Sequence, residues 1–395
     1  MDDIKGRGTF AAAVAALVAA LVGFGGTLAL LLAAASAVGA RPAQTASLLF
    51  TVCLGVALTS AILSWRLRMP VITAWSTPGL AVIAAFAAGI GMERVVGAVL
   101  MSAVLVMACA AIRPLGALVA RLPMGVAAAM LAGVLVRFVM ALADNAAARP
   151  ALVLPLVALF FLARQWSASA AVLCVLVAGT GVIFVLGLNA PLTLAFVPPH
   201  LEWIAPHFDL NVMLGLGIPL FLVTMAAQNL PGLAVLRAAG YHPPPAPLLA
   251  VTGFASLLTA PFGSPGVNLA AITAAICAGP DAHPDPARRY LTGLFYCVWY
   301  LLLAASGASL AVVFAALPSA FIATVAGLAL LAPLTGALST ALASEQGRLA
   351  AVATFATTAS GVVVMGIGAP VWGLAVGLAI LALERLGPVR LKGAG

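Results

Sequence analysis

Two short stretches that combine serine or threonine with proline and glycine hold groups able to bind an anion. Ser76–Gly79 and Ser264–Gly266 each begin an apolar segment of about 13 residues, which is too short to cross a bilayer as a helix. We therefore expect two half-helices, Pro78–Ile90 and Pro265–Ala278, entered through extended backbone. The first N–H groups of such helices lack intrahelical partners, and the helix dipole makes these ends positive, so they can bind an anion without a buried cation. The candidate residues are Ser76, Thr77, Gly79, Ser264, Gly266 and Asn268, the last of which we expect three residues into the second half-helix.

Side chains with amide or hydroxyl groups interrupt an otherwise apolar segment, Pro219–Gly232, which reads PLFLVTMAAQNLPG. Thr224 and Gln228 are four residues apart, so a helix would place them on one face. Polar residues inside membranes tend to face the bundle interior or a cavity. We expect Thr224, Gln228 and Asn229 to bind a ligand, and the alternative is that the amides only join helices by hydrogen bonds.

Three aromatic residues, Phe24, Trp75 and Phe262, lie near these polar stretches and could form the wall of a site for an apolar or aromatic ligand. Packing between helices, or a place in the aromatic belt at the membrane surface, is the alternative for each. Trp75 is the best candidate, since it adjoins the first half-helix.

Ionisable groups are almost absent from the apolar runs. Arg137 alone falls well inside a predicted span, where a contact with a carbonyl or an ion pair is favoured over a contact with substrate. The four histidines fall in loops and are expected to be solvated. No Asp or Glu falls at the centre of a span, so the sequence identifies no proton relay. The five cysteines form no CxxC pair, and we expect no metal, cofactor or disulfide framework.

The composition requires a lipid environment. Apolar residues make up 64% of the 395-residue chain and charged residues only 7%, against about 25% charged residues in soluble proteins. The net charge of +8 does not indicate nucleic-acid binding, because the basic residues are scattered singly between apolar runs. Sequence motifs typical of enzymes, such as HExxH, GxSxG and a P-loop, are missing, so we expect no enzyme.

Turn residues and single charges divide the chain into twelve apolar helices, and the two half-helices bring the number of passes to fourteen. With the N-terminus in the cytoplasm, 14 of the 18 Lys and Arg residues fall inside, 3 outside and 1 within a span. Omitting a half-helix would destroy this asymmetry, so we predict both termini in the cytoplasm. The twelve helices are predicted at 10–38, 46–64, 93–112, 123–143, 150–164, 168–188, 210–236, 247–260, 288–316, 318–342, 348–365 and 369–386.

Short similarities recur in the same order along residues 1–200 and 201–395. They pair Ala37–Pro42 with Ala238–Pro243, Thr77–Gly79 with Ser264–Gly266, Leu122-Pro123 with Leu317-Pro318, and Ser360–Val362 with Thr180–Val182. Seven passes in each half invert the second half in the membrane, and inverted repeats with broken helices are typical of secondary transporters. The predicted fold class is therefore an all-α integral membrane protein with 14 transmembrane segments in two inverted repeats of seven.

The chain resembles the benzoate/proton symporter family, BenE. The resemblance rests on PVITAWSTPG at Pro70–Gly79, on Pro219–Gly232, on Pro261–Gly263, on NLAAITAAIC at Asn268–Cys277, and on His283–Asp285.

The resemblance implies import of benzoate or a similar aromatic carboxylate with a proton across the inner membrane. It also implies the seven-plus-seven fold of the uracil permease type. Segments 1–4 and 8–11 would form a core domain, and segments 5–7 and 12–14 a gate domain. Nucleobase relatives carry glutamates where this chain has the neutral Gln228 and Asn268, which suits an anionic substrate. Many BenE members have a histidine in the turn that is Ser264–Gly266 here.

Other functions remain open at this point. A nucleobase or inorganic-anion transporter of the same fold is the alternative, and an anion channel is disfavoured because the polar residues concentrate at one level. The oligomeric state is open, a homodimer included.

Overall fold

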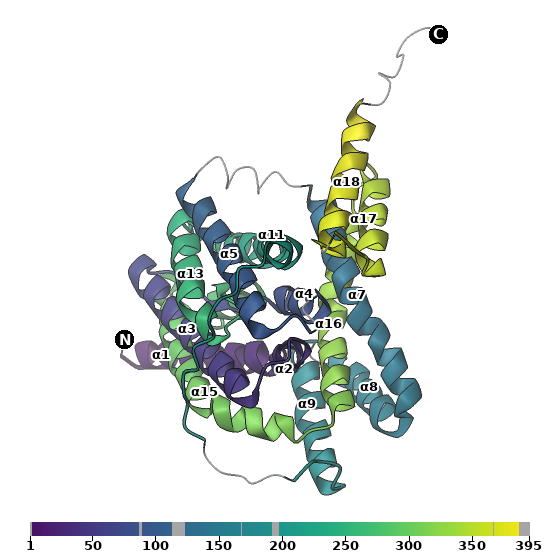
Figure 1. The fold of residues 1–395 in the computed structure, drawn as a ribbon. Helices are drawn as coiled ribbons and strands as arrows, with labels where there is room; N and C mark the ends of the chain where they lie inside the picture. Colours follow the sequence, from purple (N-terminus) through teal and green to yellow (C-terminus); the bar gives the residue numbers. More distant parts are fainter. Residues whose placement is uncertain are drawn as a thin grey trace.

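The computed structural model describes residues 2–86, 89–112, 123–166, 168–191, 197–365 and 367–386. Four basic residues used in the charge argument, Arg113, Arg121, Arg390 and Lys392, lie outside the described residues. The rest of the chain is almost entirely helical (Figure 1).

Eight segments of the described chain are long and apolar enough to cross a membrane, and all coincide with predicted spans. They comprise α1 (Asp2–Gly25) with α2 (Leu28–Ala37), α3 (Pro42–Leu67), α5 (Met92–Ala111), α7 (Met124–Ala148), Leu210–Ala238, α13 (Pro245–Thr259) with the one-turn 3₁₀ helix η3 (Ala260–Phe262), the 3₁₀ turn η4 (Pro286–Arg288) with α15 (Leu291–Ala315), and α16 (Ser319–Leu342). Shorter helices occupy the other predicted segments: α4 (Thr77–Phe86), α8 (Pro150–Arg164), α9 (Ala168–Val185), α14 (Ile272–Ala278), α17 (Arg348–Ser360) and α18 (Ala369–Leu386).

Two of the long spans are irregular. The first breaks at Gly26 and Thr27, between α1 and α2, so the prediction of one continuous helix there was wrong. The span Leu210–Ala238 contains two π turns, which precede Pro219 and Pro231 closely. Proline removes a backbone donor and clashes with the preceding turn, and a wider π turn accommodates both effects. The order along this span is α10 (Leu210–Val212), η1 (Met213–Gly217), α11 (Ile218–Thr224), η2 (Met225–Asn229) and α12 (Leu230–Ala238).

Two extended segments cross at the centre of the molecule. Strand β1 (Thr73–Ala74) pairs antiparallel with β2 (Asn268–Leu269), with Thr73 opposite Leu269 and Ala74 opposite Asn268. Serines on the preceding helices satisfy the neighbouring backbone, since Ser64 Oγ bonds both N and O of Val71, and Ser256 Oγ bonds both N and O of Val267. Both segments thus keep their backbone polar groups paired away from water.

The second half-helix begins later than the sequence suggested. It starts at Ile272 rather than Pro265, so Asn268 lies on β2 and not within the helix. A helix cannot run through Gly263 and Gly266, because their φ angles are +92° and +97°, and Asn268 and Leu269 that follow are extended.

The equivalence of the two Pro-Gly turns was therefore wrong. Thr73 of β1 and Asn268 of β2 are 195 positions apart, as are Pro123 and Pro318, which directly precede α7 and α16. Thr77 of α4 correspondingly matches Ile272 of α14.

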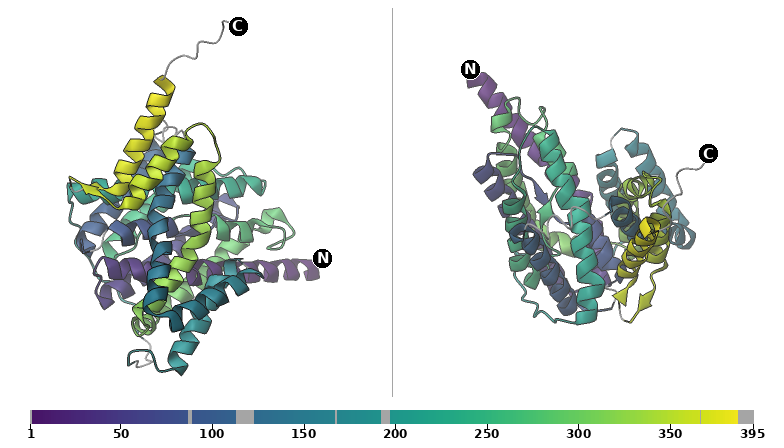
Figure 2. Two further views of the ribbon diagram at one scale, coloured as in Figure 1. Left: turned by 90° about the vertical axis from the view of Figure 1, so that its right-hand side faces the viewer. Right: turned by 90° about the horizontal axis from the view of Figure 1, so that it is seen from above.

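The helices pack into two bundles (Figures 1 and 2). The first bundle contains α1–α5 and α10–α15, in which α3 packs on α15 and α13 packs on α5. The second bundle contains α7–α9 and α16–α18, in which α16 packs on α7 and α17 packs on α18. The division into a core domain and a gate domain, and relative motion between them, stay predictions.

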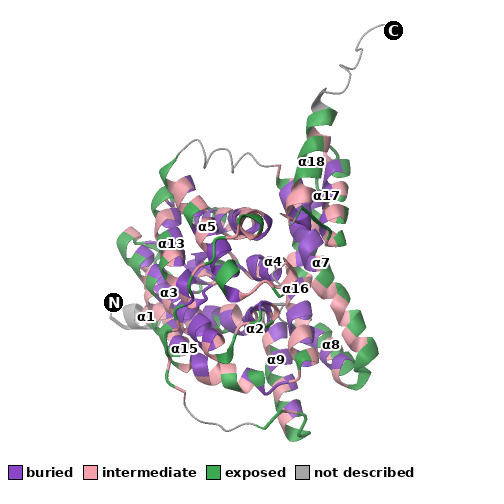
Figure 3. Cartoon of the chain, in the orientation of Figure 1, coloured by how far each residue is buried: buried purple, intermediate pink, exposed green. Residues whose placement is uncertain are grey.

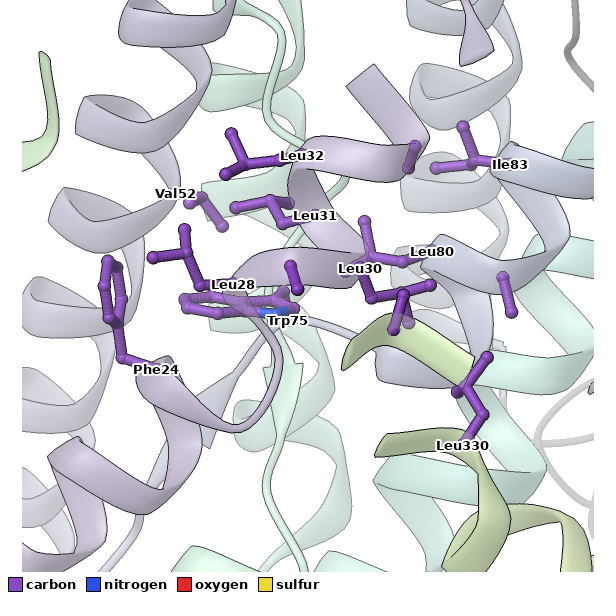
Figure 4. Packing of buried hydrophobic residues seen from close by; sticks show 14 of the residues in the cluster. Phe24, Leu28, Leu30, Leu31, Leu32, Val52, Trp75, Leu80, Ile83 and Leu330 are labelled. Atoms are coloured by element: carbon purple, nitrogen blue, oxygen red, sulfur yellow. The ribbon is translucent and has the colours of Figure 1, made fainter. Parts of the chain in front are cut away.

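Buried residues concentrate where the helices face one another, whereas outward faces are exposed and apolar (Figure 3). One cluster packs around Trp75 and includes Phe24 and Leu28 from the first span, Leu80 of α4 and Leu330 of α16 (Figure 4). Trp75 makes an edge contact with Phe24, at 6.0 Å between ring centroids. The half-helix α4 is therefore anchored by apolar contacts from both bundles.

The C-terminal part of the second bundle differs from prediction. Helix α17 ends at Ser360 rather than at residue 365, and a hairpin of β3 (Val363–Val364) and β4 (Ile367–Gly368) precedes α18. Gly361 ends α17 in the left-handed conformation, and the guanidinium of Arg137 packs against it. Thr180 lies inside α9, so the proposed match between Ser360–Val362 and Thr180–Val182 was also wrong.

Candidate substrate-binding site

A cavity of about 450 Å³ lies where the two half-helices meet α7 and α16. Its walls are the start of α4, the start of α14, the π turn η2 and the facing sides of α7 and α16, so it lies between the two bundles. The polar side chains at its wall are those of Thr77, Gln228 and Thr340, and none of the described lining residues is charged. The remaining wall is apolar and includes Pro78, Met124, Leu131, Val223, Ala227, Pro231, Ile272, Pro333 and Gly336.

The start of α4 presents Thr77 to this cavity. Ser76 is buried, and its Oγ accepts a hydrogen bond of 2.9 Å from Gly79 N, as a helix N-cap does. Pro78 has no N–H to leave unpaired, so few backbone N–H groups of this first turn lack a partner. Thr77, which is half-buried, is the group left facing the ligand space. Gly79 packs instead against Ser76 and Leu220, where a side chain would meet Leu220 Cδ1 at 2.7 Å.

The two asparagines hold the crossing strands in place. Asn229 is fully buried, and its Oδ1 accepts a 2.9 Å hydrogen bond from Leu269 N. The Asn268 amide lies 2.8 Å from Ser76 N and 3.0 Å from Leu269 O, and only the orientation with its oxygen toward Ser76 satisfies both. Neither residue lines the cavity. For these two asparagines, the structure supports the alternative given above, in which the amides hold parts of the fold together by hydrogen bonds.

Gln228 is placed differently from its neighbour. It is half-buried and lines the cavity, on the π turn η2. Thr224 is buried and does not line the cavity, whereas Val223 does. The i, i+4 rule fails here because a π turn contains more residues per turn than an α-helix. The expectation that Thr224 and Gln228 share one face toward the ligand was therefore wrong.

The turn before β2 lies away from the cavity. Ser264 is buried and accepts a 3.3 Å hydrogen bond from Gly266 N, next to a void of only about 20 Å³. Phe262 packs edge-on against Trp203, with ring centroids 5.5 Å apart. Ser264, Gly266 and Phe262 thus shape the extended entry to β2 and do not reach the cavity.

Trp75 and Phe24 lie behind the cavity wall. Trp75 is buried and makes edge contacts with both Phe24 and Tyr300 of α15, the latter at 6.1 Å. Neither Trp75 nor Phe24 lines the cavity in this conformation. Both support the segment that leads into α4.

Sequence reasoning missed the contribution of α16. Pro333, Gly336 and Thr340 recur along one side of this helix and line the cavity. A proline inside an apolar helix, followed by glycine and threonine, was the available signal.

The expectation of solvated histidines was wrong for His283. This residue is buried beside Gly8 of α1, with Nδ1 accepting a 3.0 Å hydrogen bond from Asp285 N and with Nε2 unpaired. Arg289, also buried, donates to the carbonyls of His283 and Ala278. These contacts join the loop after α14 to the start of α1, away from the cavity.

Comparisons with known proteins agree with this architecture. A family model described as "BenE: Benzoate membrane transport protein" matches residues 8–383. The chain belongs to this family. The family's "Benzoate membrane transport protein" from Acinetobacter baylyi is 32% identical over 378 residues, covering 96% of each chain. The "Inner membrane protein YdcO" from Escherichia coli is 35% identical over 364 residues, covering 92% of this chain and 93% of that protein.

The fold of this chain is also seen among solved structures. The transmembrane domain of a cyanobacterial bicarbonate transporter, BicA, matches with a TM-score of 0.64 over 94% of this chain and 98% of that one, at 18% identity. The chain is thus a multi-pass membrane protein of a transport family, and the resemblance noted in the sequence is confirmed.

Proposed function

We propose that this protein imports benzoate or a similar aromatic carboxylate across the inner membrane. The observation that carries the proposal is the cavity of about 450 Å³ at the junction of the half-helices. Ligand sites are typically 300–1,000 Å³, mostly apolar, with a few placed polar groups. Thr77 and Gln228 offer donors to a carboxylate, and the apolar remainder suits an aromatic ring.

The lining argues against the alternatives. A nucleobase presents several donors and acceptors along its edge, and only Thr77, Gln228 and Thr340 among the described lining residues could pair with them. A small inorganic anion would make few favourable contacts with the broad apolar wall. The relative named for benzoate supports the same substrate class.

We also propose fourteen passes in two inverted repeats, with both termini in the cytoplasm. The matching order of helices around β1 and β2, and the antiparallel pairing of these strands, support the inversion. The first bundle would act as the core and the second as the gate, with the cavity between them closed alternately toward each side. The relative named as an inner membrane protein supports the location.

We further propose that import is coupled to a proton, as membership of the family suggests; no described lining residue is ionisable, so the proton would be carried by a group outside the described cavity wall. Uptake of labelled benzoate into vesicles under an imposed pH gradient, acid outside, tests it. Protein-free vesicles set the baseline, because neutral benzoic acid diffuses through lipid and is trapped as benzoate on the alkaline side. Accumulation above this baseline supports symport. Uptake that is faster than in protein-free vesicles but reaches only the same level contradicts symport, and uptake identical to that of protein-free vesicles contradicts the proposed substrate.

A blocking variant tests whether the cavity is the site. Gly336 lines the cavity and a side chain there would meet nothing within 4 Å, so Gly336→Leu places a leucine in the ligand space. Gly181 of α9 has equally open surroundings outside the cavity, so Gly181→Leu is the matched control. We expect benzoate transport to be lost in the first variant and kept in the second. Transport retained by Gly336→Leu would place the substrate elsewhere.

A further inference from the structure

A groove of about 540 Å³ lies on the second bundle, between α8 and α9 (Figure 1). On α8 its lining runs from Leu152 to Leu159 along one face, at spacings of three and four residues. On α9 the lining runs from Ala178 to Leu186, mainly at spacings of four. The groove is therefore a seam that follows both helices, and it shares no lining residue with the substrate cavity.

The length of this seam matches the acyl layer of one leaflet. Leu159 is seven positions after Leu152 and Leu186 is eight positions after Ala178, so at about 1.5 Å per residue the lining extends about 10–12 Å along the helices. Half of the hydrocarbon core of a bilayer is about 15 Å. The neighbouring outward side chains are apolar and exposed, as surfaces that contact lipid are, and an acyl chain would cover the seam along its length.

A single cation lies at one end of the seam. Arg149 directly precedes α8, is exposed and lines the groove, whose other described lining residues are all uncharged. Its guanidinium forms no ion pair or hydrogen bond with any described residue. Asp144, the acidic residue nearest to it in sequence, does not line the groove. The positive charge is thus free to bind an anionic group from outside the chain.

The base of the groove is formed by packing with α16. Leu156 and Gly179 are the buried members of the lining, and Gly179 lies directly against Leu156 and Phe321 of α16. Ala178 beside it is also small. The side chains of α9 at this level are therefore too short to fill the seam from within the bundle.

We propose that this groove binds one anionic phospholipid, with its phosphate at Arg149 and an acyl chain along the seam between α8 and α9. Basic residues at the membrane surface favour anionic over zwitterionic headgroups. A free phosphate would leave the apolar seam uncovered, and a second copy of this chain would have to bring a carboxylate to Arg149. The site does not depend on which substrate the protein carries.

Thermal unfolding of the purified protein in detergent tests the headgroup. With phosphatidylglycerol and phosphatidylcholine added at equal mole fraction, we expect the first to raise the Tm by about 2 °C or more above the second, because a ligand of the folded state stabilises it. Arg149→Gln should lose most of this difference and Arg149→Lys should keep it. Arg164→Gln, which removes a cation at the other end of α8 and outside the groove, is the matched control and should keep the full difference. A full difference in Arg149→Gln, or an equal loss in Arg164→Gln, overturns the proposal.

A filling variant tests the acyl chain in the same assay. Ala178→Phe places a ring in the seam, whereas Val177→Phe places one at the neighbouring exposed position outside the lining. We expect the first to abolish the rise specific to phosphatidylglycerol and the second to retain it. Equal responses of the two variants overturn the seam as the binding site.

Three other outcomes would assign the groove to a different occupant and overturn the proposal. The first is a rise in Tm with inorganic phosphate alone as large as that with phosphatidylglycerol. The second is a rise with benzoate that Ala178→Phe abolishes. The third is a change from dimer to monomer in Ala178→Phe while the response to phosphatidylglycerol stays intact.

A density map of the unaltered protein in nanodiscs that contain phosphatidylglycerol needs no variant. We expect elongated density along the seam that ends at the guanidinium of Arg149. An empty groove in a map that resolves the side chains around it overturns the proposal.

Discussion

Gln228 is uncharged, and replacing it with a negatively charged residue should weaken anion binding more than any other change. Gln228→Glu keeps nearly the same shape and adds a carboxylate to the cavity wall. A sphere of the cavity's volume, about 450 Å³, is about 9.5 Å across, and that width bounds the distance between the new carboxylate and the substrate carboxylate. At an effective dielectric constant of about 20, like charges repel by about 1.8 kcal/mol at about 9 Å and about 3.3 kcal/mol at about 5 Å. These values correspond to a loss of affinity of about 20-fold to 300-fold.

Equilibrium binding of labelled benzoate to purified protein at neutral pH measures this loss. Gln165→Glu is the matched control, because Gln165 is exposed at the end of α8 and is not among the lining residues. We expect the control to bind as the unaltered protein does. Gln228→Leu, which removes the amide without adding charge, should bind more tightly than Gln228→Glu. Unchanged affinity in Gln228→Glu would refute the placement of the substrate carboxylate in this cavity.

Three further changes test contacts that hold the fold together, two of them next to the cavity. Asn229→Leu leaves the buried N–H of Leu269 unpaired and should lower the free energy of unfolding by about 1–3 kcal/mol in denaturant unfolding of the purified protein. Ser76→Ala removes the N-cap of α4 and should cost about 1 kcal/mol in the same assay, and Ser76→Thr should retain most of that. Gly377→Leu would bring a side chain to within 2.0 Å of Thr354 Oγ1 and should separate α18 from α17, seen as faster proteolysis of the C-terminal helices, and an unchanged cleavage rate would contradict this packing.

Local patterns in the sequence predicted the first half-helix well. Ser76 and Pro78 are typical of a helix start, and the apolar run after them is too short to span, so the start of α4 could be placed to within a residue, although the helix ends at Phe86 rather than at Ile90. The second half-helix was misplaced by seven residues because Ser264–Gly266 looks like the same signal. Its extended course depends on Asn229 and Ser256, which are distant in sequence and contribute hydrogen bonds that no local pattern reveals.

The candidate site was predicted in part. Thr77 and Gln228 line the cavity, as their types and positions indicated, whereas the π turn moved Thr224 away from it. Asn268 and Asn229 were recognised as unusual in an apolar context, yet their role in pairing the strands needed the structure. Residues of the opposite wall come from α16, and only the packing of the two bundles brings them to the half-helices.

Competition binding with a matched neutral ligand tests the central claim most directly. Labelled benzoate bound to the purified protein would be challenged with unlabelled benzoate, with benzamide, which has the same ring without the charge, and with uracil. The cavity described here predicts that benzoate competes at a concentration at least tenfold lower than either of the others, and that Gly336→Leu abolishes the bound label while Gly181→Leu retains it. Displacement by uracil or benzamide as effective as that by benzoate would contradict an aromatic-carboxylate transporter.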